Sequence, residues 1–272
     1  MWRGMLWNTY GALGRSRLAV AAALKLRNQS EMLLARFLGE DSNVQVNGEH
    51  RVLELIAGSV GTFVDVGANV GNWSQVLLEI GGAEKKGLLI EPSRAAFQKL
   101  EERFGANRNF QLVRAAMSDA EGEARFFEEK NAGEKSLLLE SWCAEDAEGV
   151  AVRVTTVDSE VAKTGWECVD LLKIDAEGYD FHVIQGARRL LSRHGIGIVQ
   201  FEYNAPWALA GNTLAAAIRL FEGYGYKVYL ARTTGLHPLN YARWGEFYRC
   251  TNFVAVSPRM FSLISPLLQP EI

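Results

Sequence analysis

Cysteine is scarce in this sequence, and its few occurrences follow no pattern. Cys143, Cys168 and Cys250 are odd in number and widely spaced, with no CxxC pair among them. This spacing excludes a disulfide framework and a zinc site built from paired cysteines. Free thiols of this kind are typical of a reducing compartment, so we expect a cytoplasmic protein.

Long apolar runs are also missing. The run LAVAAAL (18–24) is much shorter than the roughly 20 residues that a helix needs to cross a bilayer. It is followed at once by KLR, which is not the flank of a cleaved signal peptide. We therefore expect neither a spanning helix nor a signal peptide.

Positive charge is not in excess, since 29 Lys and Arg stand against 32 Asp and Glu, a net charge of −3. This balance excludes a general nucleic-acid binder. Residues 1–38 differ, because they contain six basic residues and one acidic residue, Glu31, a local net charge of 6 − 1 = +5. The segment predicts a solvated helical face, and peripheral contact with an anionic membrane surface or an acidic substrate is the functional alternative. Its basic residues are Arg3, Arg15, Arg17, Lys25, Arg27 and Arg36.

The order of the expected elements indicates a parallel sheet. Apolar strands alternate with helices of about 10–14 residues, which is typical of a doubly wound α/β fold with both faces of the sheet covered. ARFFEE and VRVTTVD alternate in polarity and predict an antiparallel ribbon. We expect an N-terminal helical extension over 1–59, with two or three short helices over 5–40 and one more over 52–59, then a catalytic domain over 60–258 and a tail over 259–272. The expected strands are 62–67, 86–92, 109–119, 168–178, 196–204, 226–232 and 250–258, and one helix is expected over 180–195.

A glycine loop follows the first expected strand, in TFVDVGANVGNWSQVLLEIGG (62–82). Gly67 and Gly71 allow a sharp turn and a close ligand, because neither residue has a Cβ atom. The next helix begins near Asn72, and its free amide groups face the same place. The middle glycine of the dinucleotide fingerprint GxGxxG is absent, and Asp65 favours a ligand with positive charge.

Acidic residues end three successive strands. Glu91 stands 20 residues after Gly71, where a carboxylate can accept from both hydroxyls of a ribose. Asp119 can accept from an adenine amino group, and Asp65 completes a set that suits a positively charged adenosine, S-adenosylmethionine. The predicted cofactor-binding residues are Asp65, Gly67, Ala68, Asn69, Gly71, Asn72, Glu91, Pro92, Ser118 and Asp119.

Longer stretches carry a family resemblance, above all SDAEGEARF and LKIDAEGYD, with FVDVGANVGNWS, IEPSRAAFQKL, VTTVDS, IVQFEYN and NFVAV. Over about 60–258 the sequence resembles the FkbM family of S-adenosylmethionine-dependent methyltransferases. The resemblance implies a Rossmann-like sheet of seven strands in the order 3-2-1-4-5-7-6, with the last-formed strand antiparallel. It also implies O-methylation of polyketides, sugars or glycolipids. It assigns Asp65, Gly67, Asn69 and Gly71 to the methionine end of the cofactor, Glu91 to the ribose, and Ser118 with Asp119 to the adenine end.

KIDAEGYD (173–180) and QFEYN (200–204) close two strands beside the glycine loop. An acceptor hydroxyl must lose its proton, so Asp175 or Glu202 is a candidate general base, with Lys173 as its partner charge. Alternatively, Asp175, Glu202 and Asn204 bind Mg²⁺, which would acidify the hydroxyl. Glu177 either joins this set or caps the next helix.

Two histidines are further candidate bases. His182 lies one turn into the helix after KIDAEGYD, and His237 lies on an expected loop between the sixth and seventh strands. We expect in-line methyl transfer to a hydroxyl of a small-molecule, glycan or lipid-linked acceptor, with oligomers of the chain as a further partner. An NAD-dependent oxidoreductase on the same core is the alternative, and a non-catalytic binding module is a third hypothesis.

Overall fold

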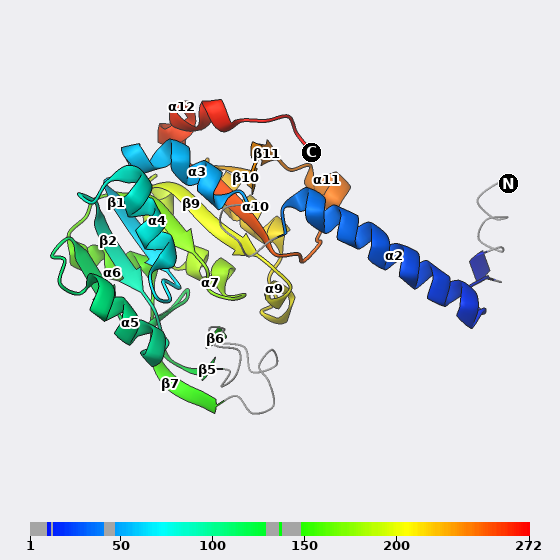
Figure 1. Cartoon of the computed structure of the whole chain (residues 1–272), viewed down its shortest axis with the longest axis horizontal. Coiled ribbons are helices and arrows are strands. Elements are labelled where there is room, and N and C mark those ends of the chain that lie inside the picture. The colour runs from blue at the N-terminus through cyan, green and yellow to red at the C-terminus, as the bar shows by residue number, and fades with distance from the viewer. Residues whose placement is uncertain (1–9, 12, 41–46, 129–135, 138–147) are drawn as a thin grey trace. The chain divides into compact units, whose positions relative to one another are not determined.

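The computed structural model describes residues 10–11, 13–40, 47–128, 136–137 and 148–272 (Figure 1). The chain divides into two compact units, Met1–Glu40 and Asp41–Ile272. In the described part of the first unit, residues 17–38 form one continuous helix, α2 (Arg17–Leu38), so the prediction of several short helices is wrong there. The Ser16 side chain accepts from the Ala19 amide at its start, and left-handed Gly39 ends it. No described helix is long and apolar enough to cross a membrane.

The second unit contains an eight-stranded sheet. Its order confirms the predicted 3-2-1-4-5-7-6 arrangement, with β12 antiparallel to both of its neighbours. The eighth strand, at the edge, covers residues 235–238, so the expected loop at His237 is wrong. From edge to edge the strands are β3 (Phe110–Val113), β2 (Lys86–Ile90), β1 (Thr62–Val66), β8 (Val169–Ile174), β9 (Ile196–Tyr203), β12 (Thr251–Val256), β10 (Lys227–Arg232) and β11 (Gly235–Pro238).

Strand β1 lies in the middle of this sheet, parallel to β2 and to β8. The Asp170 carboxylate accepts hydrogen bonds of 2.9 Å from the amides of Gly61 and Thr62, which fixes the register of β8 against β1. In that register Asp65 faces Lys173, and Lys173 faces Gln200 on β9. Three polar side chains therefore form one row across the centre of the sheet.

A second sheet of four strands lies apart from the first. Its antiparallel pair β5 and β7 confirms the predicted ribbon. The strand expected over 109–119 divides, because β3 stays in the main sheet while residues 116–117 pair with β7. The strands are β4 (Ala116–Met117), β7 (Glu148–Thr155), β5 (Gly122–Glu128) and β6 (Ser136–Leu137).

One face of the main sheet is covered by helices that contribute to a single core with Phe63, Leu171 and Ile198. In α3 the buried residues Val52 and Ile56 are four positions apart and so lie on one stripe. Although α3 falls within the predicted extension 1–59, it belongs to the second unit. The elements on this side are α3 (Glu49–Ile56), η1 (Ala57–Ser59), α4 (Asn72–Gly81), α5 (Arg94–Phe104) and α12 (Phe261–Ile264), with η3 (Pro258–Met260) and η4 (Ser265–Leu267) beside α12.

Aromatic stacking covers the opposite face. Phe201 on β9 stacks on Trp207 and Phe221, with ring centroids 6.0 and 5.6 Å apart. The remaining helices are α6 (Val157–Thr164), α7 (Asp180–Gln185), α8 (Arg188–Ser192), α9 (Pro206–Leu209), α10 (Leu214–Gly223) and α11 (Tyr241–Trp244) (Figure 1).

The helix expected over 180–195 divides at Gly186 into α7 and α8. A Cβ atom at Gly186 would collide with the carbonyl oxygen of Ser118, so the backbone passes too close for any other residue. The Asp158 carboxylate then accepts from the amides of Arg189 and Leu190 at 2.8 and 3.0 Å. These two bonds satisfy amide groups at the start of the new helix.

Candidate active site

The glycine loop after β1 lies directly against the loop after β8. Gly67 has a φ of 71°, and a Cβ atom there would collide with the carbonyl oxygen of Asp175. Gly71 has a φ of 82°, and a Cβ atom there would press on the ring of Phe104. No side chain caps α4, which starts at Asn72, so the first amide groups of α4 remain available to an anionic group. Both glycines are thus required by the geometry of the loop.

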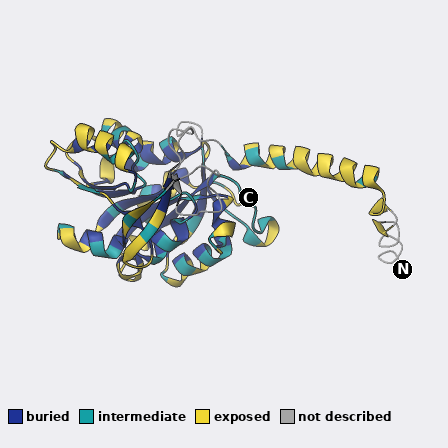
Figure 2. Cartoon of the chain, turned by 90° about the horizontal axis from the view of Figure 1, so that it is seen from below, coloured by how far each residue is buried: buried dark blue, intermediate teal, exposed yellow. Residues whose placement is uncertain are grey.

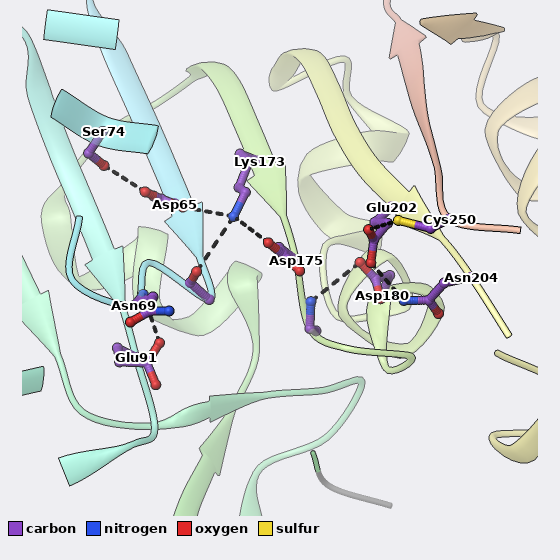
Figure 3. A network of polar contacts seen from close by, with 12 residues as sticks. Asp65, Asn69, Ser74, Glu91, Lys173, Asp175, Asp180, Glu202, Asn204 and Cys250 are labelled. Carbon is purple, nitrogen blue, oxygen red and sulfur yellow. Dashed lines mark hydrogen bonds and ion pairs between the residues drawn. The ribbon is translucent and has the colours of Figure 1, made fainter. Parts of the chain in front are cut away.

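Asp65, Lys173 and Asp175 form a chain of charges at the ends of β1 and β8 (Figure 3). Lys173 Nζ lies 3.1 Å from Asp175 Oδ2 and 3.6 Å from Asp65 Oδ1. Ser74 donates a hydrogen bond of 2.6 Å to the other oxygen of Asp65. The side chains of Asp65 and Lys173 are 0% and 7% exposed, whereas that of Asp175 is 43% exposed. Of these three charged side chains, Asp175 is therefore the one that a second reactant can reach.

The charges in this chain depend on one another. Burial raises the pKa of Asp65, and Lys173 and Ser74 offset part of that rise. Burial alone would lower the pKa of Lys173, but Asp175, Asp65 and Glu49 hold it above its ordinary value. Lys173 therefore stays positively charged at neutral pH and can hold a carboxylate beside it.

Glu91 ends β2 and ties two loops together. Its carboxylate accepts hydrogen bonds of 2.8 Å from the amides of Asn69 and Ser93, one at each oxygen. Burial raises its pKa to about 7, although these two bonds act in the opposite direction. Each oxygen keeps a second lone pair, so Glu91 can still accept from two hydroxyl groups of a ligand. Pro92 follows it and is partly exposed.

Ser118 and Asp119, predicted for the adenine end, follow β4 of the smaller sheet and not a strand of the main sheet. The Ser118 amide donates to the Thr155 carbonyl at 2.9 Å, and its hydroxyl donates to Asp119 Oδ1 at 3.1 Å. The carbonyl of Ser118 is the group that Gly186 approaches. Backbone contacts from two elements therefore hold this turn in place.

Glu202 and Asn204 form a second polar group at the end of β9 (Figure 3). Asn204 Nδ2 donates to Glu202 Oε2 at 2.6 Å, and Cys250 Sγ lies 2.7 Å from Glu202 Oε1. Burial, and then the nearby charge of Asp175, raise the pKa of Glu202 to about 8. The same two causes raise the pKa of Asp180, at the start of α7, to about 7. At neutral pH Glu202 is thus mainly a neutral hydrogen-bond donor.

The predicted Mg²⁺ ligands divide between these two groups. Asp175 contacts Lys173, while Glu202 and Asn204 bond to each other. Among the described residues, no three His, Cys, Asp or Glu side chains are arranged to hold a metal ion. Magnesium assistance stays a prediction.

The histidines and Glu177 lie around this centre in different ways. His182 on α7 contacts Asn212 Nδ2 through Nδ1 at 3.1 Å and stacks on Tyr179 at 4.9 Å. His237 lies on β11, four strands from β8, and its two ring nitrogens contact Thr234 Oγ1 and the Pro270 carbonyl. The structure therefore does not bring His237 to Lys173. Glu177 has a φ of 49° in the loop after β8.

Two buried residues beside Lys173 were not predicted. Glu49, in the first turn of α3, is 8% exposed, and burial raises its pKa to about 7 while Lys173 lowers it. Gln200 is 1% exposed, and its amide interacts with the Glu49 carboxyl group and lowers the pKa of that group. Gln200 interrupts the apolar alternation of IGIVQFEYN, which is a signal that could have identified it. Nothing in the sequence around Glu49 distinguishes it.

Comparison with known proteins gives one family match. Residues 65–228 match the Methyltransferase FkbM domain, which covers more than half of the chain. No curated protein matches the sequence.

Several solved structures are similar in fold. The methyltransferase FkbM from Methylobacillus flagellatus KT shares 16% identity at a TM-score of 0.47 over 72% of this chain, which spans only 43% of that protein's length. The precorrin-6y C5,15-methyltransferase from Geobacter metallireducens GS-15 shares 13% identity at a TM-score of 0.41, with 77% and 88% of the two chains covered. The O-methyltransferase TomG from Streptomyces achromogenes, in complex with SAM, shares 11% identity at a TM-score of 0.38, with 77% and 79% covered.

These likenesses concern the fold and do not identify an acceptor. The family match includes the glycine loop, Glu91 and both polar groups at the ends of β8 and β9. The family match therefore favours a methyltransferase over the alternative of an NAD-dependent oxidoreductase. The chain belongs to the FkbM methyltransferase family.

Proposed function

We propose that this enzyme transfers the methyl group to a hydroxyl oxygen of a sugar, glycolipid or polyketide-type acceptor. The observation that carries the proposal is the ion pair of 3.1 Å between Lys173 and the half-exposed Asp175, directly beside the glycine loop. An alcohol needs a base because its pKa lies far above neutral pH, whereas a thiolate or a neutral amine can accept a methyl group without one.

The cofactor residues predicted from the sequence suit an amino acid joined to an adenosine. The uncapped start of α4 offers amide groups to a carboxylate, and Asp65 Oδ1, whose contact with Lys173 Nζ is an ion pair of 3.6 Å, is a buried acceptor beside the loop. Glu91 offers a free lone pair on each oxygen to ribose hydroxyls, and Ser118 with Asp119 would contact the adenine. Bound there, the cofactor supplies a methyl group made electrophilic by a sulfonium charge.

Two carboxyl groups take different roles at this centre because their surroundings differ. The Asp175 side chain lies 3.1 Å from the charged Lys173 and can accept the proton of the acceptor hydroxyl. Glu202, with a pKa near 8, keeps its proton at neutral pH and can donate a hydrogen bond to the same acceptor. Two carboxyl groups in different surroundings can divide the work of base and donor in this way.

Unpartnered polar atoms support an acceptor with several hydroxyl groups. Among the described residues Asn204 lacks a hydrogen-bond partner for Oδ1, and the buried Gln200 amide has donor and acceptor capacity beyond its interaction with the Glu49 carboxyl group. Buried polar groups without partners are uncommon and cost about 1–3 kcal/mol each. A hydroxyl group both donates and accepts, so it can satisfy either kind of atom.

The test is methyl transfer from S-adenosylmethionine carrying a radioactive methyl group. The full chain is incubated with sugars, lipid-linked glycans and polyketide macrolides, and with matched amine and carboxylic acid acceptors. We expect label in an ether that survives mild alkali. Label that mild alkali releases as methanol would indicate a methyl ester, and label on nitrogen or carbon would likewise contradict the proposal.

A further inference from the structure

Helix α2 is exposed along most of its length (Figure 2), and several of its exposed side chains are large and apolar. It is 22 residues long, which corresponds to roughly 33 Å at 1.5 Å per residue. Leu26 and Leu33 are 66% and 72% exposed, and Leu34 and Phe37 are 43% and 39% exposed. Contiguous exposed apolar surface of this kind usually marks a place where something binds.

One side of the helix carries apolar side chains and no charged ones. At about 100° per residue, four large apolar residues, three alanines and Ser30 fall within one arc of roughly 120°, whereas other exposed apolar side chains lie outside it. Those outside the arc are Leu18, Val20, Leu24 and Met32. We call this arc the apolar face of α2. It consists of Ala19, Ala22, Ala23, Leu26, Ser30, Leu33, Leu34 and Phe37.

Basic residues lie along both edges of the apolar face. Lys25 and Arg36 fall on one edge and Arg27 on the other, while Arg17 lies opposite the face. Glu31 is the acidic residue of the helix, and it pairs with Arg27 at 3.3 Å. The helix therefore carries a charge of 4 − 1 = +3 around an apolar stripe.

We propose that α2 docks the enzyme on an anionic lipid bilayer surface, with its apolar face in the headgroup boundary and its basic edges on the lipid phosphates. A helix that lies in a membrane interface combines an apolar stripe with flanking Lys and Arg in this way. Charge decides against a second copy of the chain as the occupant. Two α2 helices packed face to face would bring two charges of +3 together, whereas an anionic surface attracts both edges at once.

The helix can also form without support from the sheet. Ser16 caps its start, and the Gly39 and Glu40 amides donate to the carbonyls of Arg36 and Ala35 at its end. Length and caps are what an isolated helix needs in water. The docking surface is thus in place before lipid is met.

The test is co-sedimentation of the full chain with vesicles of phosphatidylcholine alone or with a third of phosphatidylglycerol. We expect binding to the anionic vesicles, at least tenfold weaker binding to the neutral ones, and release by high salt. Lys25→Gln or Arg36→Gln should each weaken binding about fivefold, which corresponds to about 1 kcal/mol per basic residue. Leu26→Glu with Leu33→Glu should abolish it.

Matched controls are Arg108→Gln and Val150→Glu, since both residues are exposed and lie in the second unit. Their binding should equal that of the wild type. Circular dichroism checks that the charge variants, which leave the apolar face intact, remain helical. Equal binding to both vesicle types, no binding at all, or a dimer by light scattering that Leu33→Glu dissolves would each overturn the proposal.

Discussion

Replacing Glu91 with glutamine tests the cofactor site most directly. In the native protein the carboxylate accepts from the Asn69 and Ser93 amides at 2.8 Å and keeps one lone pair on each oxygen for a ribose hydroxyl. Glutamine has one acceptor oxygen, so its NH₂ group faces an amide donor or a ribose hydroxyl. A hydrogen bond to a charged group contributes about 1.5–3 kcal/mol, and the loss of one weakens S-adenosylhomocysteine binding roughly 10- to 100-fold.

The pH dependence of binding gives a second signature of the same contact. Burial raises the pKa of Glu91 to about 7, so the unliganded site is mostly protonated at pH 6 and mostly ionised at pH 8. Ribose hydroxyls donate to the ionised form. Native affinity should therefore rise about tenfold from pH 6 to pH 8, since one pKa unit corresponds to a factor of ten. The Glu91→Gln protein should show a flat profile.

Isothermal titration calorimetry with S-adenosylhomocysteine measures both effects. Glu102→Gln, on the exposed side of α5, is the matched control and should bind like the native protein. If Glu91→Gln bound with native affinity, or kept the native pH dependence, Glu91 would not be the ribose acceptor. Our assignment of the carboxyl end of β2 to the adenosine would then be wrong.

Three further outcomes follow from the same site. Gly67→Ala should abolish the binding of S-adenosylhomocysteine in calorimetry, because its Cβ atom would meet the Asp175 carbonyl. The control is Gly82→Ala, which should keep binding, since Gly82 also has a positive φ, of 90°, but no atom within 4 Å of the added Cβ. Lys173→Met should lower the free energy of unfolding by about 3–5 kcal/mol in urea titration, since it leaves Asp65 unpaired in the core; an unchanged midpoint would refute the role of the ion pair. Asp175→Asn should reduce the rate of methyl transfer at least 100-fold at every pH. Glu202→Gln should keep its activity at pH 6–7. In the native enzyme the rate should change near pH 8, where Glu202 loses its proton, and this change should be absent from Glu202→Gln. If instead native activity rose through pH 8 and Glu202→Gln were inactive, Glu202 would be the base.

The sheet could be predicted because its strands are nearly continuous apolar runs that end in charged residues. Lys173 and Asp175 were expected together for this reason, and they form an ion pair. The contact of Lys173 with Asp65 on the neighbouring strand was not predicted. The eighth strand was missed because GLHP contains a proline, which reads as a loop signal, and its pairing with β10 depends on the edge position where a proline is tolerated.

Contacts between distant segments could not be predicted. The break at Gly186 follows from the approach of Ser118, which is 68 positions earlier in the chain. Glu49 reaches the polar row only because α3 belongs to the second unit, although its sequence continues a helical extension. Periodicity reports which face of an element is buried, but not which element buries it.

The pairing of β1 with β8 also limits when the centre of the sheet can form during synthesis. The Asp170 carboxylate and the Thr62 amide that it holds are 108 residues apart in sequence. Such a contact closes a long loop, and it forms slowly compared with the local helices on either side of it. A ribosome must therefore release β8 before Asp65 can meet Lys173, so the ion pair at the centre of the site forms only after about two thirds of the chain has been made.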